Sequence, residues 1–300
     1  MTQVQSWLHA FRLRTLPLAF SSILLGAFLA ASEGHFKGKI LLLALLTTLF
    51  LQILSNLAND YGDYVKGTDN DNRIGPERSL QAGLISVKAM KGALILFSLL
   101  SFVSGITLLQ VSGAFYDPRI SFFFLGLGLI CILAAITYTV GKNAYGYKGL
   151  GDISVLFFFG FVGVLGTHFL MANHFNSGNI PMAIFNGLLA TGVLNLNNLR
   201  DIENDKASGK NSIPVLIGFR AGKVYHFLLI SFSYFFLVLY FFFHLQGLLR
   251  FGFLFLLPAF VWHIYAVWQT VENRKLDPFL KQLALTSLFS TLSIGCILVY

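Results

Sequence analysis

Charged residues are scarce in this chain of 300 residues. Lys, Arg, Asp and Glu make up only 11% of it, whereas 56% is hydrophobic. A soluble domain carries about 25% charged residues and could not bury so large an apolar fraction. The composition therefore excludes a soluble fold. With a mean hydropathy of +0.72, it predicts an all-α polytopic membrane protein surrounded by membrane lipid.

Cysteine is nearly absent as well. The two cysteines, Cys131 and Cys296, both lie inside apolar runs. Their number and setting exclude a disulfide framework and a cysteine zinc site, and favour small hydrophobic packing residues. The net charge of +8 would suggest nucleic acid in a soluble protein. Here it is expected to reflect basic cytoplasmic loops, so no nucleic-acid partner is predicted.

Long apolar runs are abundant, and nine of them approach the roughly 20 residues that a membrane-spanning helix needs. The first follows Arg12 and Arg14 like a signal peptide, but because many spans follow it we expect it to be retained. We expect residues 1–300 to form a single integral-membrane domain, a bundle of about nine transmembrane helices. The predicted spans are 16–32, 39–59, 91–112, 120–140, 153–172, 180–199, 223–243, 250–270 and 282–300.

The distribution of basic residues predicts the orientation of this bundle. Of 21 Lys and Arg residues, all but Lys37, Lys39, Arg119 and Arg250 fall on the side that also holds the N-terminus. Because basic residues are enriched in cytoplasmic loops, we expect a cytoplasmic N-terminus. The expected location is the cytoplasmic (inner) membrane, and the longer loops after the second and sixth spans then face the cytoplasm.

Two acidic stretches end the second and sixth spans. In the first, the spacing of Asn56, Asn59, Asp60 and Asp63 places them on one face of a helix. The second repeats the spacing of four residues from Asn to Asp, with Asn197, Asp201 and Asp205. The sequence therefore predicts that two polar faces meet at the cytoplasmic ends of these spans.

Carboxylates at these positions are unfavourable unless a cation accompanies them. They lie at helix C-termini, where the helix dipole adds negative charge to their mutual repulsion. Oxygen ligands without cysteine favour Mg²⁺ or Ca²⁺, with Asp60, Asp63, Asp201 and Asp205 as candidate ligands. Basic residues in the neighbouring loops suit a diphosphate, and the apolar surroundings suit a long apolar tail. The alternative interpretation is that these charges are interfacial anchors paired with nearby basic groups.

The two stretches resemble the paired Asp-rich motifs of the UbiA superfamily of intramembrane aromatic prenyltransferases. Residues 59–69, the segment 73–76 that begins with Arg73, and residues 148–152 are similar to the menaquinone-pathway branch, which prenylates 1,4-dihydroxy-2-naphthoate. Gly67 stands where the commoner pattern has a third Asp, and Asp69 lies two residues further on. That branch shares the shift. The resemblance runs from Arg14 to the loop after the sixth span.

The resemblance implies an enzyme that transfers a polyprenyl group from polyprenyl diphosphate to 1,4-dihydroxy-2-naphthoate, with loss of CO₂. It implies Mg²⁺ ions that bridge the diphosphate to Asp63, Asp69, Asp201 and Asp205, with help from Asn59 and Asn197. Candidates for closing on the diphosphate are Arg78, Lys142, Lys206 and Lys210. Tyrosines near the inner face, among them Tyr138 and Tyr147, either face an allylic cation or form an interfacial belt. Asp152 either caps a helix or binds the aromatic acid.

Other functions remain open from the sequence alone. The aromatic acceptor could instead be 4-hydroxybenzoate or homogentisate, and haem or a sugar phosphate are further acceptors of related enzymes. A transporter would use the acidic faces as a cation pathway, but its carboxylates are expected near the middle of the bilayer. A structural membrane subunit gives no reason for the paired motifs.

Overall fold

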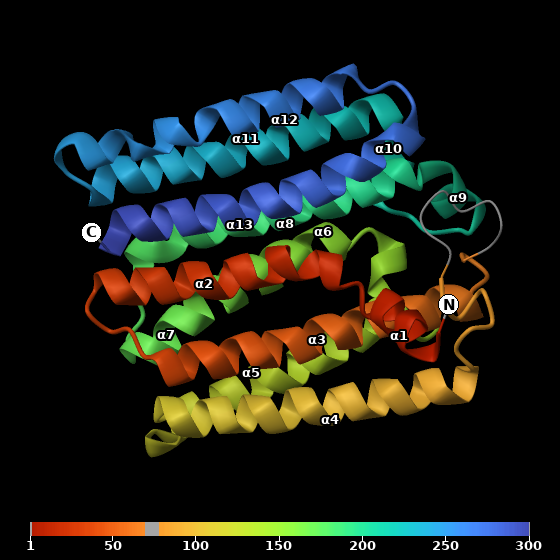
Figure 1. Ribbon diagram of the computed structural model, residues 1–300, viewed down its shortest axis with the longest axis horizontal. Coiled ribbons are helices and arrows are strands. Elements are labelled where there is room, and N and C mark those ends of the chain that lie inside the picture. Colours follow the sequence, from red (N-terminus) through yellow and green to blue (C-terminus); the bar gives the residue numbers. More distant parts are fainter. Residues whose placement is uncertain (1, 70–77, 300) are drawn as a thin grey trace.

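The computed structural model describes residues 2–69 and 78–299, and these residues form a bundle of long, roughly parallel helices (Figure 1). Within the described residues, nine helical segments are long and apolar enough to cross a membrane, which confirms the predicted number of spans. Arg73 and the rest of the 73–76 segment lie outside the described residues. The nine segments are Gln3–Ser32, Gly38–Val65, Val87–Ser112, Pro118–Thr137, Gly151–Ala172, Ser177–Arg200, Phe219–His244, Gly247–Gln269 and Asn273–Val299.

The N-terminal helix α1 (Gln3–Phe11) was not predicted. It begins with a capping box in which the Thr2 hydroxyl accepts from the Gln5 amide and the Gln5 side chain accepts from the Thr2 amide. Its apolar side, with Trp7 and Phe11, packs on the cluster that also contains Leu57. The short helix therefore lies against α3 (Gly38–Val65) near one end of the bundle.

Helix α8 (Ile180–Arg200) occupies the middle of the bundle. It packs against α11 (Phe219–His244), against α13 (Asp277–Val299) and against the fifth span. Helices α4 (Val87–Ser112) and α5 (Pro118–Thr137) lie on the opposite side of the bundle from α11 and α12 (Leu257–Gln269). The apolar side chains that α4 and α5 expose are those expected of a lipid-facing surface.

The fifth span is irregular. It consists of α6 (Gly151–Val155), a π-helical segment at Leu156–Gly166 and α7 (Thr167–Ala172). A Cβ atom on Gly160 would lie 2.5 Å from the carbonyl oxygen of Ala183, and one on Gly163 would lie 2.7 Å from Cβ of Ser22. Glycine at these positions lets α8 and α2 (Leu16–Ser32) approach the span closely, as small residues do in membrane bundles.

The two ends of the bundle differ. One end carries α1 together with the short helices α9 (Ile202–Ala207) and α10 (Ile213–Ile217), which follow α8 (Figure 1). The opposite end carries the tight connections from α2 to α3 and from α7 to α8. Both acidic stretches lie at the end with the short helices, because α3 and α8 run in the same direction.

Candidate active site

The first acidic stretch turns back on its own helix. Gly67 follows the end of α3 with φ of +71°, a left-handed conformation that glycine adopts without strain. The amides of Thr68 and Asp69 consequently point at the carbonyl oxygen of Asp63, at 2.9 and 3.4 Å. The turn thus returns Asp69 to the helix end, which explains how an Asp displaced by two residues reaches the same site as Asp63.

The second stretch bends where α8 ends. Asp201 lies between α8 and α9, and its carbonyl oxygen accepts the amide of Asp205 at 2.8 Å. The side-chain nitrogen of Asn204 donates to the carbonyl oxygen of Thr68 at 2.9 Å. This bond joins the two acidic stretches directly, so their side chains share one space.

That space is a small polar cavity of about 70 Å³. It brings together six predicted residues, three from each acidic stretch. Three predicted substrate-binding residues, Arg78, Tyr138 and Lys210, lie in the same lining. Its lining is Arg12, Asn59, Asp63, Thr68, Asp69, Arg78, Tyr138, Thr139, Leu194, Asn197, Asn198, Asp201, Asn204, Asp205 and Lys210. Arg12, Thr68, Thr139, Asn198 and Asn204 were missed, and for Asn198 and Asn204 their place inside the second motif was an available signal.

Two basic side chains balance part of the acidic charge. Nζ of Lys210 lies 2.9 Å from a carboxylate oxygen of Asp205, and Nε of Arg78 lies 3.9 Å from one of Asp69. Burial of Lys210 opposes its charge, but Asp205 and Asp63 outweigh this effect and raise its pKa. Burial raises the pKa of Asp205, and Lys210 counters the rise. Lys210 is therefore a fixed positive charge inside the cavity.

Tyr147 contacts the end of α3 from a position that is not part of the cavity lining. Its hydroxyl donates to a carboxylate oxygen of Asp63 at 2.7 Å and lies 2.5 Å from the hydroxyl of Thr68. Burial and the nearby Asp63 raise the pKa of Tyr147, so its hydroxyl keeps the proton that it donates. The ammonium of Lys66 lies 3.7 Å from the centre of the tyrosine ring. Tyr147 therefore orients Asp63 and does not line the cavity.

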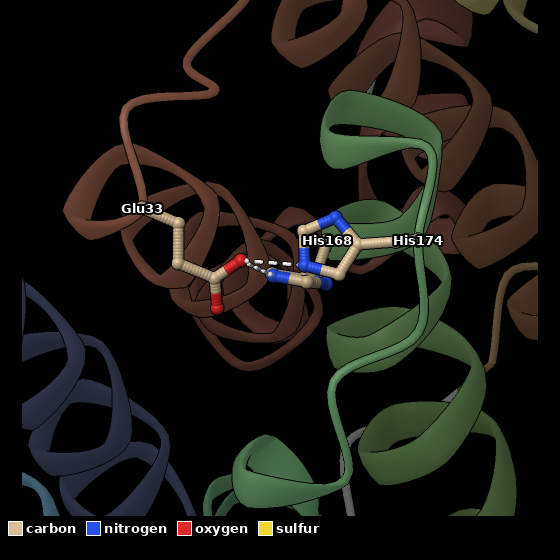
Figure 2. Close-up of side chains that lie close together, drawn as sticks. All are labelled: Glu33, His168 and His174. Carbon is tan, nitrogen blue, oxygen red and sulfur yellow. Dashed lines mark hydrogen bonds and ion pairs between the residues drawn. The ribbon is translucent and has the colours of Figure 1, made fainter.

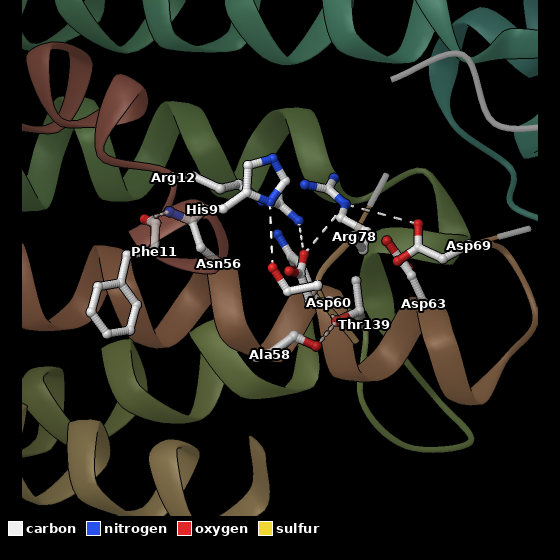
Figure 3. Close-up of polar contacts among 12 residues, drawn as sticks. His9, Phe11, Arg12, Asn56, Ala58, Asp60, Asp63, Asp69, Arg78 and Thr139 are labelled. Carbon is white, nitrogen blue, oxygen red and sulfur yellow. Dashed lines mark hydrogen bonds and ion pairs between the residues drawn. The ribbon is translucent and has the colours of Figure 1, made fainter. Parts of the chain in front are cut away.

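Asp60 and Asn56 do not line the polar cavity, and Asp60 lies beside Arg12 and Arg78 (Figure 3). Asp60 is buried and pairs with Arg12, and Nε of Arg78 lies 3.4 Å from it. Asn56 donates to the carbonyl oxygen of Phe11 at 2.9 Å. Of the four residues expected on one face, Asn59 and Asp63 line the polar cavity, whereas Asn56 and Asp60 do not. The centres of these two pairs are about 60° apart around the helix. Asp60 was predicted to be a metal ligand. In the structure it instead joins α3 to Arg12, which directly follows α1.

Arg200 fixes the orientation of Asp201. Its Nε and one amino group donate to the two carboxylate oxygens of Asp201 at 3.0 and 2.6 Å. The same amino group donates to the side-chain oxygen of Asn197 at 2.9 Å, and the other amino group pairs with Asp277 at the start of α13. Such two-pronged contacts define the carboxylate plane. Arg200 is almost fully buried and does not line the cavity.

Three predicted substrate-binding residues lie elsewhere. Lys142 and Lys206 are exposed, and neither lines the cavity. Asp152 is buried in the first turn of α6, where its side chain accepts from the Tyr225 hydroxyl at 3.3 Å. The N-cap residue of α6 is Leu150, so Asp152 is not the helix cap.

The cavity suits a hard divalent cation. Its donors are carboxylate and amide oxygens, the ligands that Mg²⁺ and Ca²⁺ prefer. The side-chain oxygens of Asn198 and Asn204 are buried and have no hydrogen-bond partner among the described residues. Buried polar atoms are normally satisfied. A cation with its water shell would satisfy oxygens in these positions, so the donor set fits such an ion.

A second, larger cavity adjoins the polar one. It measures about 390 Å³ and is lined mainly by apolar side chains of α2, α3, α4, α5 and the fifth span. Asn59, Tyr138 and Leu194 line both cavities. Phe102 of α4 and Leu129 of α5 in its wall are about half exposed, so the apolar cavity is bounded by helices of the lipid-facing surface.

Comparison with known proteins identifies the family and the fold. The UbiA prenyltransferase family matches residues 19–289. The 1,4-dihydroxy-2-naphthoate octaprenyltransferase of Haemophilus influenzae is 45% identical over 95% of this chain and 93% of its own, and that of Escherichia coli K12 is 48% identical over 86% and 83%. A UbiA homologue from Archaeoglobus fulgidus, solved with DMAPP and Mg²⁺, shares the fold with a TM-score of 0.60 and 17% identity, covering 94% of this chain and 99% of that one. The chain belongs to the UbiA prenyltransferase family.

Proposed function

We propose that this protein transfers a polyprenyl group from polyprenyl diphosphate to 1,4-dihydroxy-2-naphthoate, with loss of CO₂, and so yields demethylmenaquinol, which becomes demethylmenaquinone on a separate two-electron oxidation. The observation that carries the proposal is a pair of adjoining cavities. One is lined by acidic and basic side chains and the other by apolar ones, and Asn59, Tyr138 and Leu194 line both. A diphosphate with a long apolar tail has the same two parts. The relatives named above, which act on this aromatic acid by name, support the acceptor.

The polar cavity is the place for the diphosphate. Asp63, Asp69, Asp201 and Asp205, with Asn59 and Asn197, would hold Mg²⁺, which neutralises charge on a diphosphate so that it leaves more readily. Lys210 and Arg78 supply positive charge in the lining of the same cavity. Lys210 stays protonated because Asp205 and Asp63 raise its pKa. These residues would therefore hold the leaving group and stabilise the charge that it gains.

The apolar cavity would hold the tail and keep water from the reacting carbon. When the bond from carbon to diphosphate oxygen breaks, its electron pair leaves with the diphosphate and an allylic cation remains. Tyr138 lies at the junction of the cavities, where its aromatic face can stabilise that cation. The ring carbon of the acceptor that bears the carboxylate then forms the new carbon–carbon bond. The acceptor loses its carboxylate as CO₂, and that bond pair restores the aromatic ring.

We further propose that residues 1–300 act as one integral-membrane domain in the cytoplasmic membrane, with the acidic cavity facing the cytoplasm. The uneven distribution of Lys and Arg supports this orientation. The acidic cavity lies at the ends of its spans and next to basic residues. This position argues against a transporter, whose ion site is expected near the bilayer midplane.

The direct test uses the purified protein in detergent. It is given Mg²⁺, polyprenyl diphosphates of several lengths and 1,4-dihydroxy-2-naphthoate, and mass spectrometry follows prenylated product and CO₂. We expect both products, and neither when EDTA is present. Product with 4-hydroxybenzoate or homogentisate alone would retain prenyl transfer and reject this acceptor. Absence of any prenylated aromatic product from folded protein would reject prenyl transfer itself.

A further inference from the structure

Three potential metal ligands meet at the end of the bundle opposite the acidic cavity (Figure 2). Glu33 directly follows α2, His168 lies on α7, and His174 lies in the connection from α7 to α8. One ligand atom of each residue lies within 4.8 Å of the ligand atoms of the other two. The group joins two connections that are about 135 residues apart in the sequence, and the proposed prenyl transfer does not use it.

The distances within the group are close to those of a zinc site. One carboxylate oxygen of Glu33, Oε2, lies 2.9 Å from Nε2 of His168 and 3.1 Å from Nε2 of His174. Two ligand atoms on a tetrahedral zinc ion, each about 2.0–2.1 Å from the metal, are roughly 3.3 Å apart. A small movement of each imidazole away from Oε2 would therefore bring these two distances to zinc-ligand spacing, and the two imidazole nitrogens lie within 4.8 Å of each other.

The other oxygen of the carboxylate is held by amides. Asn176 and Asn179 donate to Oε1 of Glu33 at 2.8 and 3.2 Å. These bonds fix the carboxylate plane and leave Oε2 directed at the two imidazoles. In metal sites, ligating carboxylates are commonly oriented by hydrogen bonds of this kind. The cluster therefore contains residues that orient the Glu33 carboxylate as well as the candidate ligands themselves.

The surroundings of His174 favour a cation at this place. Its Nδ1 lies 3.3 Å from the carbonyl oxygen of Ala172. A carbonyl oxygen only accepts, so this contact is favourable when Nδ1 carries the ring hydrogen. Nε2 is then the ring nitrogen that faces Glu33, and a backbone carbonyl is a usual partner of the second nitrogen of a metal-bound histidine.

The site is anchored on one side and open on the other. The side chain of His168 is 2% exposed, whereas those of Glu33 and His174 are 23% and 49% exposed. An ion can therefore enter from solvent and still be held by a rigid ligand. Two histidines and one glutamate form a known zinc ligand set, with the fourth position left to water.

We propose that Glu33, His168 and His174 form a binding site for Zn²⁺ that ties the connection between α2 and α3 to the connection between α7 and α8. The site is separate from the acidic cavity and differs from it in chemistry. Imidazole nitrogen favours zinc over Mg²⁺, which prefers oxygen ligands.

The test uses full-length protein in detergent, stripped with a chelator and desalted. Zn²⁺ is titrated in excess Mg²⁺, which competes for the oxygen ligands of the acidic cavity, and calorimetry and elemental analysis give affinity and stoichiometry. We expect one tightly held Zn²⁺ per chain and at least about tenfold weaker binding in His174→Ala and in Glu33→Gln. Zinc should raise the Tm of the parent protein and leave the Tm of the two variants unchanged.

His244→Ala provides the matched control. His244 is an exposed histidine near the same end, and its Nδ1 lies 3.1 Å from the carbonyl oxygen of Tyr240. This variant should bind zinc like the parent. His174 is half exposed, so its replacement leaves the packed interior intact, and circular dichroism checks folding. No zinc uptake by the parent at about 100 μM free ion, or equal uptake by parent and His174→Ala, would overturn the proposal.

Discussion

At the scale of single residues, Arg200 joins the second acidic stretch to the last helix. Its planar guanidinium contacts both oxygens of Asp201 and also pairs with Asp277. An ammonium group is a point charge and cannot reproduce this two-pronged geometry. The positions of Asp201 and Asn197 in the cavity therefore depend on a neighbour that does not itself line the cavity.

We predict that Arg200→Lys keeps the charge but loosens Asp201. The Mg²⁺ concentration for half-maximal activity should rise about 10–100-fold, because groups that orient metal ligands have effects of that size. A magnesium titration of the rate measures it. Arg220→Lys, at an exposed position at the start of α11, should leave the titration unchanged. An unaltered magnesium dependence in Arg200→Lys would contradict the positioning role.

Asp63 and Asp201 are predicted to be essential for turnover. Asp63→Ala and Asp201→Ala should each lower the rate at least about 100-fold, since each removes a charged group from the place where the leaving group gains charge. Product formation at saturating substrate and magnesium measures the loss. Glu203→Ala, on the exposed side of α9, is the control. Near-normal rates in either Asp variant, with normal membrane insertion, would contradict the proposal that these carboxylates bind a metal–diphosphate complex.

The acidic residues show what spacing can and cannot predict. The distance of four residues between Asn59 and Asp63, and between Asn197 and Asp201, predicted that each pair shares a face, and the structure places both pairs on one cavity. Their roles as ligands stay a prediction. Spacing could not separate Asp60 from this group, because its partner Arg12 lies 48 residues away in the sequence.

At the scale of helices, the approach of α3 to the segment after α5 positions the first acidic stretch. The Thr139 hydroxyl donates to the carbonyl oxygen of Ala58 at 2.8 Å and to the side chain of Asn59 at 3.3 Å. A Cβ atom on Gly62 would lie 2.7 Å from the backbone carbonyl carbon of Thr139. Glycine at position 62 is therefore what allows this contact.

We predict that Gly62→Ala separates these two segments and costs about 1–3 kcal/mol of stability, as overpacking typically does. Activity should fall as well, because Asn59 and Asp63 lie within one helical turn of the glycine. Thermal unfolding in detergent and the rate assay measure the two effects. Gly92→Ala on α4, where the added methyl group meets nothing within 4 Å, should leave both unchanged or raise stability slightly. Equal behaviour of the two variants would argue against the close contact.

The helices themselves were largely predictable from the sequence. Nine apolar runs stood out because a span must satisfy its backbone internally and face lipid. Their ends were less accurate: α4 begins at Val87, where the Ser86 hydroxyl caps it, and not near residue 91. The short helices α1 and α10 escaped notice because neither is a long apolar run, and their place depends on contacts with distant helices.

At the scale of the whole molecule, the bundle has one end with acidic and basic side chains and one end with the Glu33 cluster. The positive-inside rule predicts that the acidic end faces the cytoplasm. Lys142 is exposed near the acidic end, and Tyr116 is exposed in the connection between α4 and α5 at the other end. These two positions can report the orientation.

We predict opposite labelling of Lys142→Cys and Tyr116→Cys in intact cells by a maleimide that does not cross membranes. Both variants are made with Cys131 and Cys296 replaced by Ala, because the native thiols would react. Tyr116→Cys should be labelled from outside, and Lys142→Cys only after the cells are opened. The reverse pattern would invert the proposed orientation and place the acidic cavity outside the cytoplasm.

The two adjoining cavities also bear on how a reaction there would end. The polar one lies at the end of the bundle that carries the short helices, whereas the apolar one is bounded by the lipid-facing helices α4 and α5. Once the bond between tail and diphosphate is cleaved, the two products can leave the site by different routes. The inorganic fragment would diffuse into water, and the prenylated ring would slide sideways into the bilayer. Turnover would then depend on membrane fluidity for one product and on ionic conditions for the other.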